Sequence, residues 1–292
     1  MPAGVTRPAV GYSPRGGILA DDEPRFRIDD FRKFVRTKYA DVAEDPTKGF
    51  HFPSGRDAAR QAGYPPDLLA GIPEEAVESF CGAGNPFSNE SIHAGETVVD
   101  LGCGAGMDAL IAARMVGREG EVIGLDVTPQ MVTKARKAAA TAGVSNVRFV
   151  EGLAEALPMS DATVDVILSN GAINLIPDKP VVFAEMFRVL RPGGRVLLVD
   201  LLASREVPRS VRDLIYRWTS CVAGSVMDAE FQTLLVGAGF TEIEVGSPVD
   251  IFDGAQGELN ADHYGVLGLT IRACKPKEST AQLPAPSEAG TS

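Results

Sequence analysis

The sequence has few of the residues that build metal centres and disulfide frameworks. It contains four cysteines and three histidines among 292 residues. The cysteines, at positions 81, 103, 221 and 274, show neither the paired spacing of a zinc site nor the pattern of a disulfide-rich secreted domain. We therefore expect no metal site and a reducing compartment, for which a cytoplasmic localisation is the simplest interpretation.

Positive charge and long apolar runs are also scarce. Lysine and arginine number 28 against 39 aspartates and glutamates, so the net charge is -11. Nucleic acids and anionic membranes both attract basic surfaces, and we expect neither as a partner. No apolar run reaches the roughly 18 residues that a membrane span requires. Residues 1–17 lack the apolar segment of a signal peptide.

What the sequence does contain is a glycine motif at the end of an expected strand. A short β-branched run ends at Asp100, and glycines follow at alternate positions, Gly102, Gly104 and Gly106, before an apolar-periodic segment. This pattern predicts a strand that turns sharply into a helix. Glycines are required in such a turn because the backbone adopts unusual angles or approaches a ligand closely.

A second acid follows the next expected strand. The apolar run 121–125 ends at Asp126, where a carboxylate is placed to bind the two hydroxyls of a ribose. The glycine pattern alone is weak, since it also occurs in dinucleotide sites and in tight turns. However, Asp100 precedes the glycines, and a carboxylate suits a cationic amino group better than a pyrophosphate. S-adenosylmethionine has an amino-acid end, a ribose and an adenine but no phosphate, so the motif predicts this cofactor.

Strands and helices alternate from residue 97 onward. Besides the two strands already described, the pattern predicts strands at 147–150, 164–169, 195–202, 240–245 and 263–273, and helices at 29–43, 129–142, 180–190, 209–222 and 228–238. This alternation predicts an α/β fold with a mostly parallel sheet, helices on both faces and a ligand at the carboxyl ends of the strands.

The composition divides the chain into four parts. Residues 1–20 and 276–292 are rich in small residues and proline, which predicts a disordered N-terminus and a disordered tail. Residues 21–96 are expected to form a helical cap on the substrate side, beginning with the amphipathic helix 29–43. Residues 97–275 are expected to form the cofactor-binding domain.

Four motifs in this order resemble the class I S-adenosylmethionine-dependent methyltransferases, and within them the arsenite methyltransferase-like group. They lie at residues 100–106, 124–128, 169–179 and 190–195, with Gly84-Asn85-Pro86 upstream and residues 218–224 downstream. The resemblance implies a Rossmann-like fold with a mostly parallel seven-stranded sheet. It also implies methyl transfer to a small-molecule acceptor, and it leaves open whether the chain forms a homodimer.

The motifs and the resemblance together give the expected cofactor contacts. These are Asp100, Gly102, Cys103, Gly104, Gly106, Asp126, Val127, Leu153, Ala154 and Asn170. Leu153 stands where many relatives carry an aspartate that binds the adenine amino group, so the backbone N–H of Ala154 is the expected adenine contact. Asp100 has the alternative of capping the turn that follows, and Cys103 is expected to pack rather than react.

Three residues are candidates for the transfer step, and each has a structural alternative. Cys221 is either a pocket-lining thiol or an inert buried one. His51 is either a general base on a lid or an incidental loop histidine. Asn170 either lines the methyl-donor pocket or satisfies backbone groups of a turn.

The expected methyl acceptor follows from cysteines that the family has and this sequence lacks. In arsenite methyltransferases three cysteine thiolates bind trivalent arsenic. The first position aligns with Ala83, two residues from Cys81, the second with Gly171 and the third with Cys221. A soft metalloid requires several thiolates. We therefore expect in-line methyl transfer to a small apolar or thiol-bearing metabolite. The alternatives are arsenite methylation and a non-catalytic cofactor-binding sensor or partner protein.

Overall fold

The computed structural model describes residues 27–208, 211, 223–253 and 258–277. The segments predicted to be disordered, 1–20 and most of 276–292, lie outside the described residues, as does nearly all of the helix expected at 209–222. Within the described ranges, no helix is long and apolar enough to span a membrane.

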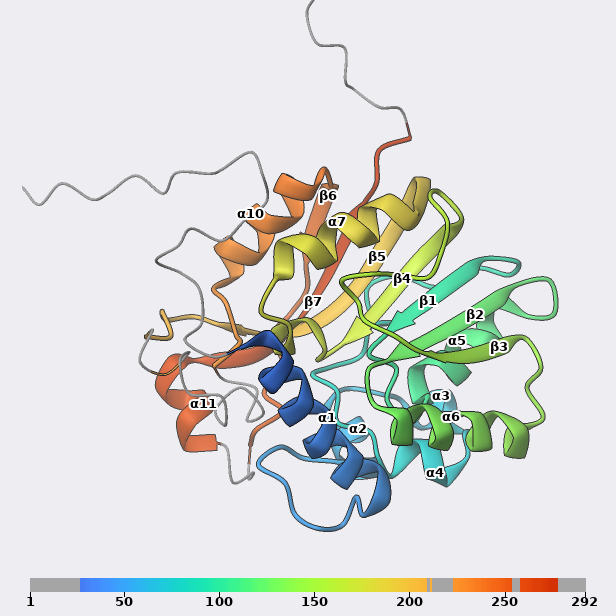
Figure 1. The fold of residues 1–292 in the computed structure, drawn as a ribbon, viewed down its shortest axis with the longest axis horizontal. Coiled ribbons are helices and arrows are strands. Elements are labelled where there is room, and N and C mark those ends of the chain that lie inside the picture. The colour runs from blue at the N-terminus through green and yellow to red at the C-terminus, as the bar shows by residue number, and fades with distance from the viewer. Residues whose placement is uncertain (1–26, 209–210, 212–222, 254–257, 278–292) are drawn as a thin grey trace, which may run out of the picture.

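A seven-stranded sheet forms the centre of the molecule (Figure 1). Its strand order is β3-β2-β1-β4-β5-β7-β6, and β7 runs antiparallel to both of its neighbours. The strands are β1 (Thr97–Leu101), β2 (Glu121–Asp126), β3 (Val147–Glu151), β4 (Val164–Asn170), β5 (Leu190–Ala203), β6 (Thr241–Val245) and β7 (Val266–Cys274). The predicted α/β fold with a mostly parallel seven-stranded sheet is confirmed.

The strand order reverses beside β1. This strand pairs in parallel with β2 on one side and with β4 on the other. In open α/β sheets a ligand site forms outside the carboxyl ends of the strands, at the point where the order reverses. Asp100, Asp126 and Asn170 stand at or beside the last residues of these three strands. The topology therefore gathers them at one edge of the sheet.

Helices cover both faces of the sheet (Figure 1). One face carries α5 (Met107–Val116) and α6 (Pro129–Ala142), together with the short helices α2 (Gly55–Gln61), α3 (Pro66–Leu69) and α4 (Glu74–Val77). The other face carries α7 (Lys179–Val189) and α10 (Asp228–Ala238). The 3-10 helix η1 (Ile173–Leu175) follows β4, and α11 (Glu258–Tyr264) precedes β7. Each face has its own cluster of buried apolar side chains.

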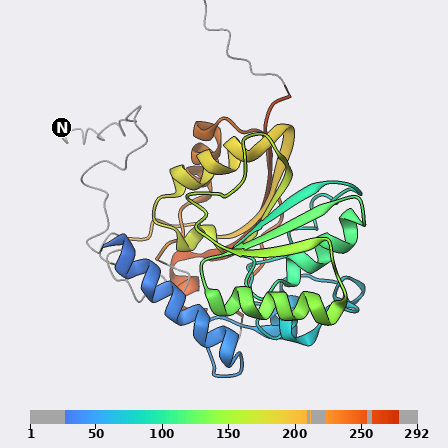
Figure 2. The ribbon, with the colours of Figure 1, turned by 45° about the vertical axis from the view of Figure 1, so that its right-hand side comes forward.

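The first helix, α1 (Ile28–Glu44), lies alongside α6 at the carboxyl edge of the sheet (Figure 2). Its apolar side chains recur at helical spacing, and Phe31 and Val35 are buried against Leu175 of η1. Charged residues occupy the intervening positions and remain in contact with solvent. The helix therefore covers the edge at which a ligand is expected.

Two element boundaries differ from the sequence prediction by three residues or more, the starts of β5 and β7. The Arg-Pro-Gly-Gly turn at 191–194 is a bulge inside β5, because Val164 of β4 pairs with Leu190 and Val166 then pairs with Arg195. The last strand begins at Val266 rather than at residue 263. Gly265 adopts a left-handed conformation (φ 58°) between α11 and β7, which ends the helix and delays the strand.

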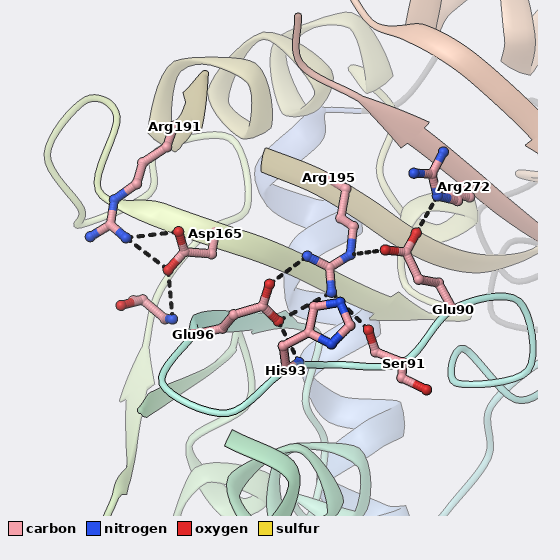
Figure 3. Close-up of polar contacts among 9 residues, drawn as sticks. Glu90, Ser91, His93, Glu96, Asp165, Arg191, Arg195 and Arg272 are labelled. Atoms are coloured by element: carbon pink, nitrogen blue, oxygen red, sulfur yellow. Dashed lines mark hydrogen bonds and ion pairs between the residues drawn. The ribbon is translucent and has the colours of Figure 1, made fainter. Parts of the chain in front are cut away.

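A partly buried cluster of ion pairs closes the opposite, amino edge of the sheet (Figure 3). The Arg195 guanidinium donates to the two carboxylate oxygens of Glu96 at 2.6 and 3.1 Å and to the carbonyl of Ser91 at 2.8 Å. It also lies 2.9 Å from Glu90, which in turn contacts Arg272 of β7. The cluster fixes the segment that precedes β1 against β5 and β7.

Candidate active site

A cavity opens at the carboxyl edge of the sheet, next to α1. All of the residues predicted to contact the cofactor except Gly106 line it, namely Asp100, Gly102, Cys103, Gly104, Asp126, Val127, Leu153, Ala154 and Asn170. The rest of the wall comes mainly from α1, the loop before β1 and the segment around η1. The structure thus brings together side chains from strand ends that are far apart in the chain.

Asp100 brings an unpartnered carboxylate oxygen to this cavity. The residue is 2% exposed, and its Oδ2 atom has no hydrogen-bond partner. Burial, together with the negative charges of Asp108 and Asp126, raises the pKa of Asp100 well above its usual value. A buried carboxylate of this kind is unfavourable unless a ligand supplies a donor or a positive charge. The turn-capping alternative is supported in part, because Asp100 accepts the backbone N–H of Ala109 in the first turn of α5, but it leaves Oδ2 without a role.

The glycines of the motif serve different purposes. Gly106 (φ 89°) precedes α5, and a Cβ atom there would lie 2.9 Å from the Phe149 ring, so this glycine permits close packing and does not line the cavity. Gly104 (φ 52°) lines the cavity, and a Cβ atom there would meet no protein atom within 4 Å. Gly104 therefore leaves room for a ligand against the backbone.

Asp126 lies at the tip of β2 and is tied to the glycine loop. Its Oδ2 atom accepts the backbone N–H of Gly104 at 2.9 Å, and its Oδ1 atom accepts that of Thr128 at 2.8 Å. Burial raises the pKa of Asp126, and these N–H groups oppose the rise. Each carboxylate oxygen has two lone pairs, so both oxygens can still accept a hydrogen bond from a ribose hydroxyl.

The wall beside β2 and β3 is apolar. It is lined by Val127, Leu153, Ala154, Phe31 and Val35. Arg32 of α1 pairs with Glu155 at 3.0 Å, which holds the helix against the loop after β3. A wall of this kind suits a flat ring such as adenine, whose orientation a few backbone groups can fix.

Comparisons with known proteins agree with this geometry. The methyltransferase domain family matches residues 92–239. An arsenite methyltransferase of Halobacterium salinarum is 34% identical over 276 residues, covering 89% of this chain and 69% of that protein. Another, from Aquipseudomonas alcaligenes, is 32% identical and covers 70% of this chain, which spans 62% of that protein's length. The crystal structure of CrArsM, an arsenic(III) S-adenosylmethionine methyltransferase from Chlamydomonas reinhardtii, matches with a TM-score of 0.63 at 35% identity over 78% of this chain and 75% of that one.

This chain belongs to the class I S-adenosylmethionine-dependent methyltransferases, in the arsenite methyltransferase-like group. The methyltransferase cavity fits that cofactor in two respects. The orphaned Oδ2 atom of Asp100 can accept from the ammonium group of the amino-acid end. The open space at Gly104 lets the nucleoside approach the backbone beside Asp126. Membership of this family supports an enzyme rather than the alternative of a non-catalytic cofactor-binding sensor or partner protein.

The residues considered for the transfer step do not all lie at the methyltransferase cavity. Cys221 lies outside the described residues. His51 is exposed, and no histidine of the described chain lines the cavity. Burial raises the pKa of the Cys103 thiol well above its usual value, and the sulfur faces β2, where a Cβ atom on Gly124 would lie 2.9 Å from it. This environment favours packing over chemistry for Cys103.

Asn170 is fully engaged by the protein. Its amide nitrogen, which carries two hydrogens, lies within hydrogen-bond distance of three acceptors, so that one hydrogen is shared: the carbonyl of Gly84 at 2.8 Å, the hydroxyl of Tyr64 at 3.0 Å and Asp108 Oδ2 at 3.0 Å. Its amide oxygen accepts the backbone N–H of Ala83 at 2.7 Å. Of the two roles left open by the sequence, the structure favours the one that satisfies backbone groups. Asn170 therefore positions the loop before β1 against the end of β4.

Sequence reasoning missed two residues of the methyltransferase site, Asp108 and Tyr64. Asp108 lies in the first turn of α5, is 6% exposed and lines the cavity. The hydroxyl of Tyr64 donates to its Oδ1 atom at 2.5 Å. The available signal was the place of Asp108 two residues after Gly106, where a carboxylate meets a helix N-terminus. Nothing in the sequence pairs it with Tyr64.

The cavity wall next to β4 depends on another buried carboxylate, Asp200 of β5. It accepts the backbone N–H groups of Ile173 at 2.8 Å, Asn174 at 3.1 Å and Leu201 at 2.7 Å. Ile173 belongs to η1 and lines the cavity. Burial raises the pKa of Asp200 to about 6, although the N–H groups and the charge of Lys179 oppose the rise.

We expect the stability of the methyltransferase to depend on pH through Asp200. Because its pKa is higher in the folded chain than the unfolded value of 3.8, the carboxyl contributes stability below about pH 4 that is lost as the pH rises through about 6. Urea unfolding of the wild type and Asp200→Asn tests this. The free energy of unfolding of the variant, relative to wild type, should rise by about 1 kcal/mol between pH 5 and pH 7.5. Parallel pH profiles for the two proteins would contradict this assignment.

Proposed function

We propose that this methyltransferase transfers a methyl group to a small apolar or thiol-bearing acceptor by in-line displacement. Bound S-adenosylmethionine supplies an electrophilic methyl group. The residues of the chain hold that cofactor, align the nucleophilic atom of the acceptor behind the methyl carbon, and exclude water from the cavity. The new bond forms at the acceptor atom as the bond from the methyl carbon to sulfur breaks.

The observation that carries this proposal is the chemistry of the cavity wall near the end of β4. Cys81, Gly82, Gly171 and Ala172 line it, and all of them are small and uncharged or weakly polar. Among the described residues that line the cavity, Arg32 is the one with a cationic side chain, and it already pairs with Glu155. An anionic acceptor requires an available cation, and an alcohol acceptor requires a general base. The carboxyls of the lining already have other partners, since Asp108 bonds Tyr64 and Asn170 and the other two aspartates are assigned to the cofactor. A thiol is partly ionised near neutral pH and needs little help.

The cover of the cavity supports an apolar acceptor. Beyond the wall that suits adenine, apolar side chains of the lining come from α1, the loop before β1 and α6, namely Tyr39, Phe80 and Met131. Such a wall binds an apolar molecule and keeps water away from the reacting atoms.

Arsenite methylation is the second candidate, favoured by the names of the similar proteins. The cavity departs from a three-thiolate site at two of the three family positions. Gly171 takes φ 73°, a conformation that a cysteine adopts only with strain, and Ala83 stands at the other position. Cys81 lines the cavity two residues before Ala83. A bound metalloid would therefore need thiolates from Cys81, from Cys221 or from small thiols that enter the cavity already bonded to it.

Formation of S-adenosylhomocysteine with a panel of acceptors tests the proposal. We expect turnover with an apolar thiol, phenol or indole at an efficiency at least about tenfold above that with arsenite, which corresponds to about 1.4 kcal/mol. Cys81→Ser and Cys221→Ser distinguish the candidates, with Cys274→Ser in β7 as the matched control. Arsenite turnover that both site variants abolish and the control retains would favour the second candidate. Cofactor binding without turnover on any acceptor of the panel would contradict the proposal.

A further inference from the structure

Three buried carboxyl groups meet in the cofactor cavity. They belong to Asp100 at the end of β1, Asp108 in the first turn of α5 and Asp126 at the end of β2, and each is less than 10% exposed at 2%, 6% and 8%. No lysine or arginine of the described chain forms an ion pair with any of them, and the hydrogen bonds they accept come from neutral groups. Three adjacent anions without a cation are strongly unfavourable in a buried site.

Hydrogen bonds and a helix dipole stabilise the ionised form of Asp108. Its Oδ1 atom accepts the Tyr64 hydroxyl at 2.5 Å, and its Oδ2 atom accepts the Asn170 amide at 3.0 Å. It also lies at the N-terminus of α5, where the helix dipole favours negative charge. Burial raises the pKa of Asp108 only to about 6, because the Tyr64 and Asn170 hydrogen bonds oppose it.

Asp100 has less support than Asp108, because the backbone N–H of Ala109 opposes the rise of its pKa but is outweighed by burial and the two neighbouring carboxyls. Its Oδ2 atom has no donor, whereas Asp126 accepts the backbone N–H groups of Gly104 and Thr128. The titratable groups that face Asp100 are the carboxyls of Asp108 from α5 and Asp126 from β2, the Tyr64 hydroxyl from the loop before α3 and the Cys103 thiol from the glycine loop. None of them is cationic, and the two carboxyls disfavour a further anion.

We propose that Asp108, held as an anion by Tyr64 and Asn170, keeps the facing Asp100 carboxyl protonated until the ammonium group of the cofactor displaces that proton. Asp100 then becomes the anion that pairs with the ammonium. Burial is the largest cause of the raised pKa of Asp100, and the charge of Asp108 adds to it. Asp108 therefore acts through Asp100 and is a positioning residue for the cofactor, because it helps to set the charge of the group that binds it. Tyr64 and Asn170 also tie this charge cluster to the loop before β1.

The step balances as a proton exchange. Asp100 in its neutral carboxyl form meets an ammonium that is already protonated. The O–H bond of Asp100 breaks, the proton passes to buffer, and a carboxylate–ammonium hydrogen bond forms in its place. One proton therefore leaves for each cofactor bound, and binding strengthens as the pH rises through the range in which Asp100 titrates.

Titration calorimetry measures the released proton directly. The heat of binding S-adenosylhomocysteine at pH 6.5 is measured in buffers of different ionisation enthalpy, and its slope against that enthalpy gives the proton count. At this pH the ammonium of the free ligand is almost fully protonated. We expect release of about one proton with S-adenosylhomocysteine and about none with methylthioadenosine, which has the same nucleoside but no amino-acid end.

Two variants separate this role from a structural one. Asp108→Asn removes the facing charge, so Asp100 ionises more readily in the free protein, and the number of protons released is expected to fall below the wild-type value, although burial and Asp126 still favour the neutral form. Tyr64→Phe removes a donor from Asp108, so the pair holds more protons before binding, and the count is expected to stay equal or rise. If the three carboxyls only maintained the shape of the cavity, both substitutions would change the number of released protons in the same direction.

Two results would overturn the proposal. One is a wild-type count below about 0.3 with saturable S-adenosylhomocysteine binding. The other is a count that Asp108→Asn leaves unchanged or that both variants lower together. The methylthioadenosine comparison uses the wild-type protein, so it shows whether proton release depends on the amino-acid end of the ligand even where a variant folds poorly.

Discussion

Replacing Asp100 by asparagine is expected to weaken S-adenosylhomocysteine binding by about 100-fold. The substitution keeps the shape of the side chain but removes the charge at the buried Oδ2 position, which has no partner in the protein. A charge-assisted hydrogen bond in such a site contributes about 2–3 kcal/mol, and about 2.8 kcal/mol corresponds to 100-fold in affinity. Titration calorimetry at pH 7.5 measures the change.

Methylthioadenosine, which has no amino-acid end, is again the control ligand for this variant. Methylthioadenosine should bind wild type and Asp100→Asn within about threefold of each other, because the nucleoside site is untouched. The variant should unfold at the same or a higher temperature at pH 7.5, since burial disfavours the charged form of Asp100. Equal loss of affinity for both ligands would mean that Asp100 shapes the cavity rather than binds the ammonium.

Replacing Arg195 by methionine is expected to lower the free energy of unfolding by about 3–5 kcal/mol. The guanidinium is 8% exposed and sits between the carboxylates of Glu90 and Glu96 at the amino edge of the sheet (Figure 3). Methionine preserves the apolar contacts of the stem but leaves Glu96, which is 16% exposed, without its partner. Urea unfolding at neutral pH measures the loss.

Arg191→Met is the matched control at the same edge. Its guanidinium bonds Asp165 at 2.7 and 2.8 Å but is 49% exposed, so the pair contributes at most about 1 kcal/mol. Both arginines lie away from the cavity, and neither variant should change the affinity for S-adenosylhomocysteine by more than about twofold. Equal destabilisation by the two substitutions would contradict the distinction between the buried and the exposed pair.

The sequence was sufficient for the features that local pattern determines. The β-branched run, the spaced glycines and the acids at strand ends located β1, β2 and the turn into α5, because each signal lies within a few residues. The helix bounds of α10 were predicted without error, since Asp228 begins its apolar periodicity and Gly239 ends it with φ 103°. The alternation of strands and helices predicted a mostly parallel sheet, whereas the order of its strands came from the structure.

Contacts between distant parts of the chain could not be predicted in the same way. Tyr64 and Asp108 are 44 residues apart, and Ala83 and Asn170 are 87 apart. Their hydrogen bonds exist because the loop before β1 folds over the strand ends, which no local pattern specifies. For this reason the sequence could place Asn170 at the cavity but could not connect it to Ala83, Tyr64 or Asp108, and it gave Asp108 no role.

Boundaries failed where a glycine or a bulge overrides hydrophobic periodicity. The bulge at 191–194 lets β5 pair with β4 on both sides of a turn signal. Gly265 separates α11 from β7 although the apolar pattern runs across it. In both cases tertiary pairing with a neighbouring strand decides the local structure, as expected for strands whose stability depends on their partners.

A crystal structure of the protein with S-adenosylhomocysteine tests the central claim most directly. We expect the nucleoside to lie across the carboxyl ends of β1 and β2, with the ammonium of the amino-acid end within hydrogen-bond distance of Asp100 Oδ2 and the ribose hydroxyls on the carboxylate of Asp126. An amino-acid end that points away from Asp100, or a ribose that does not contact Asp126 in the occupied cavity, would contradict it.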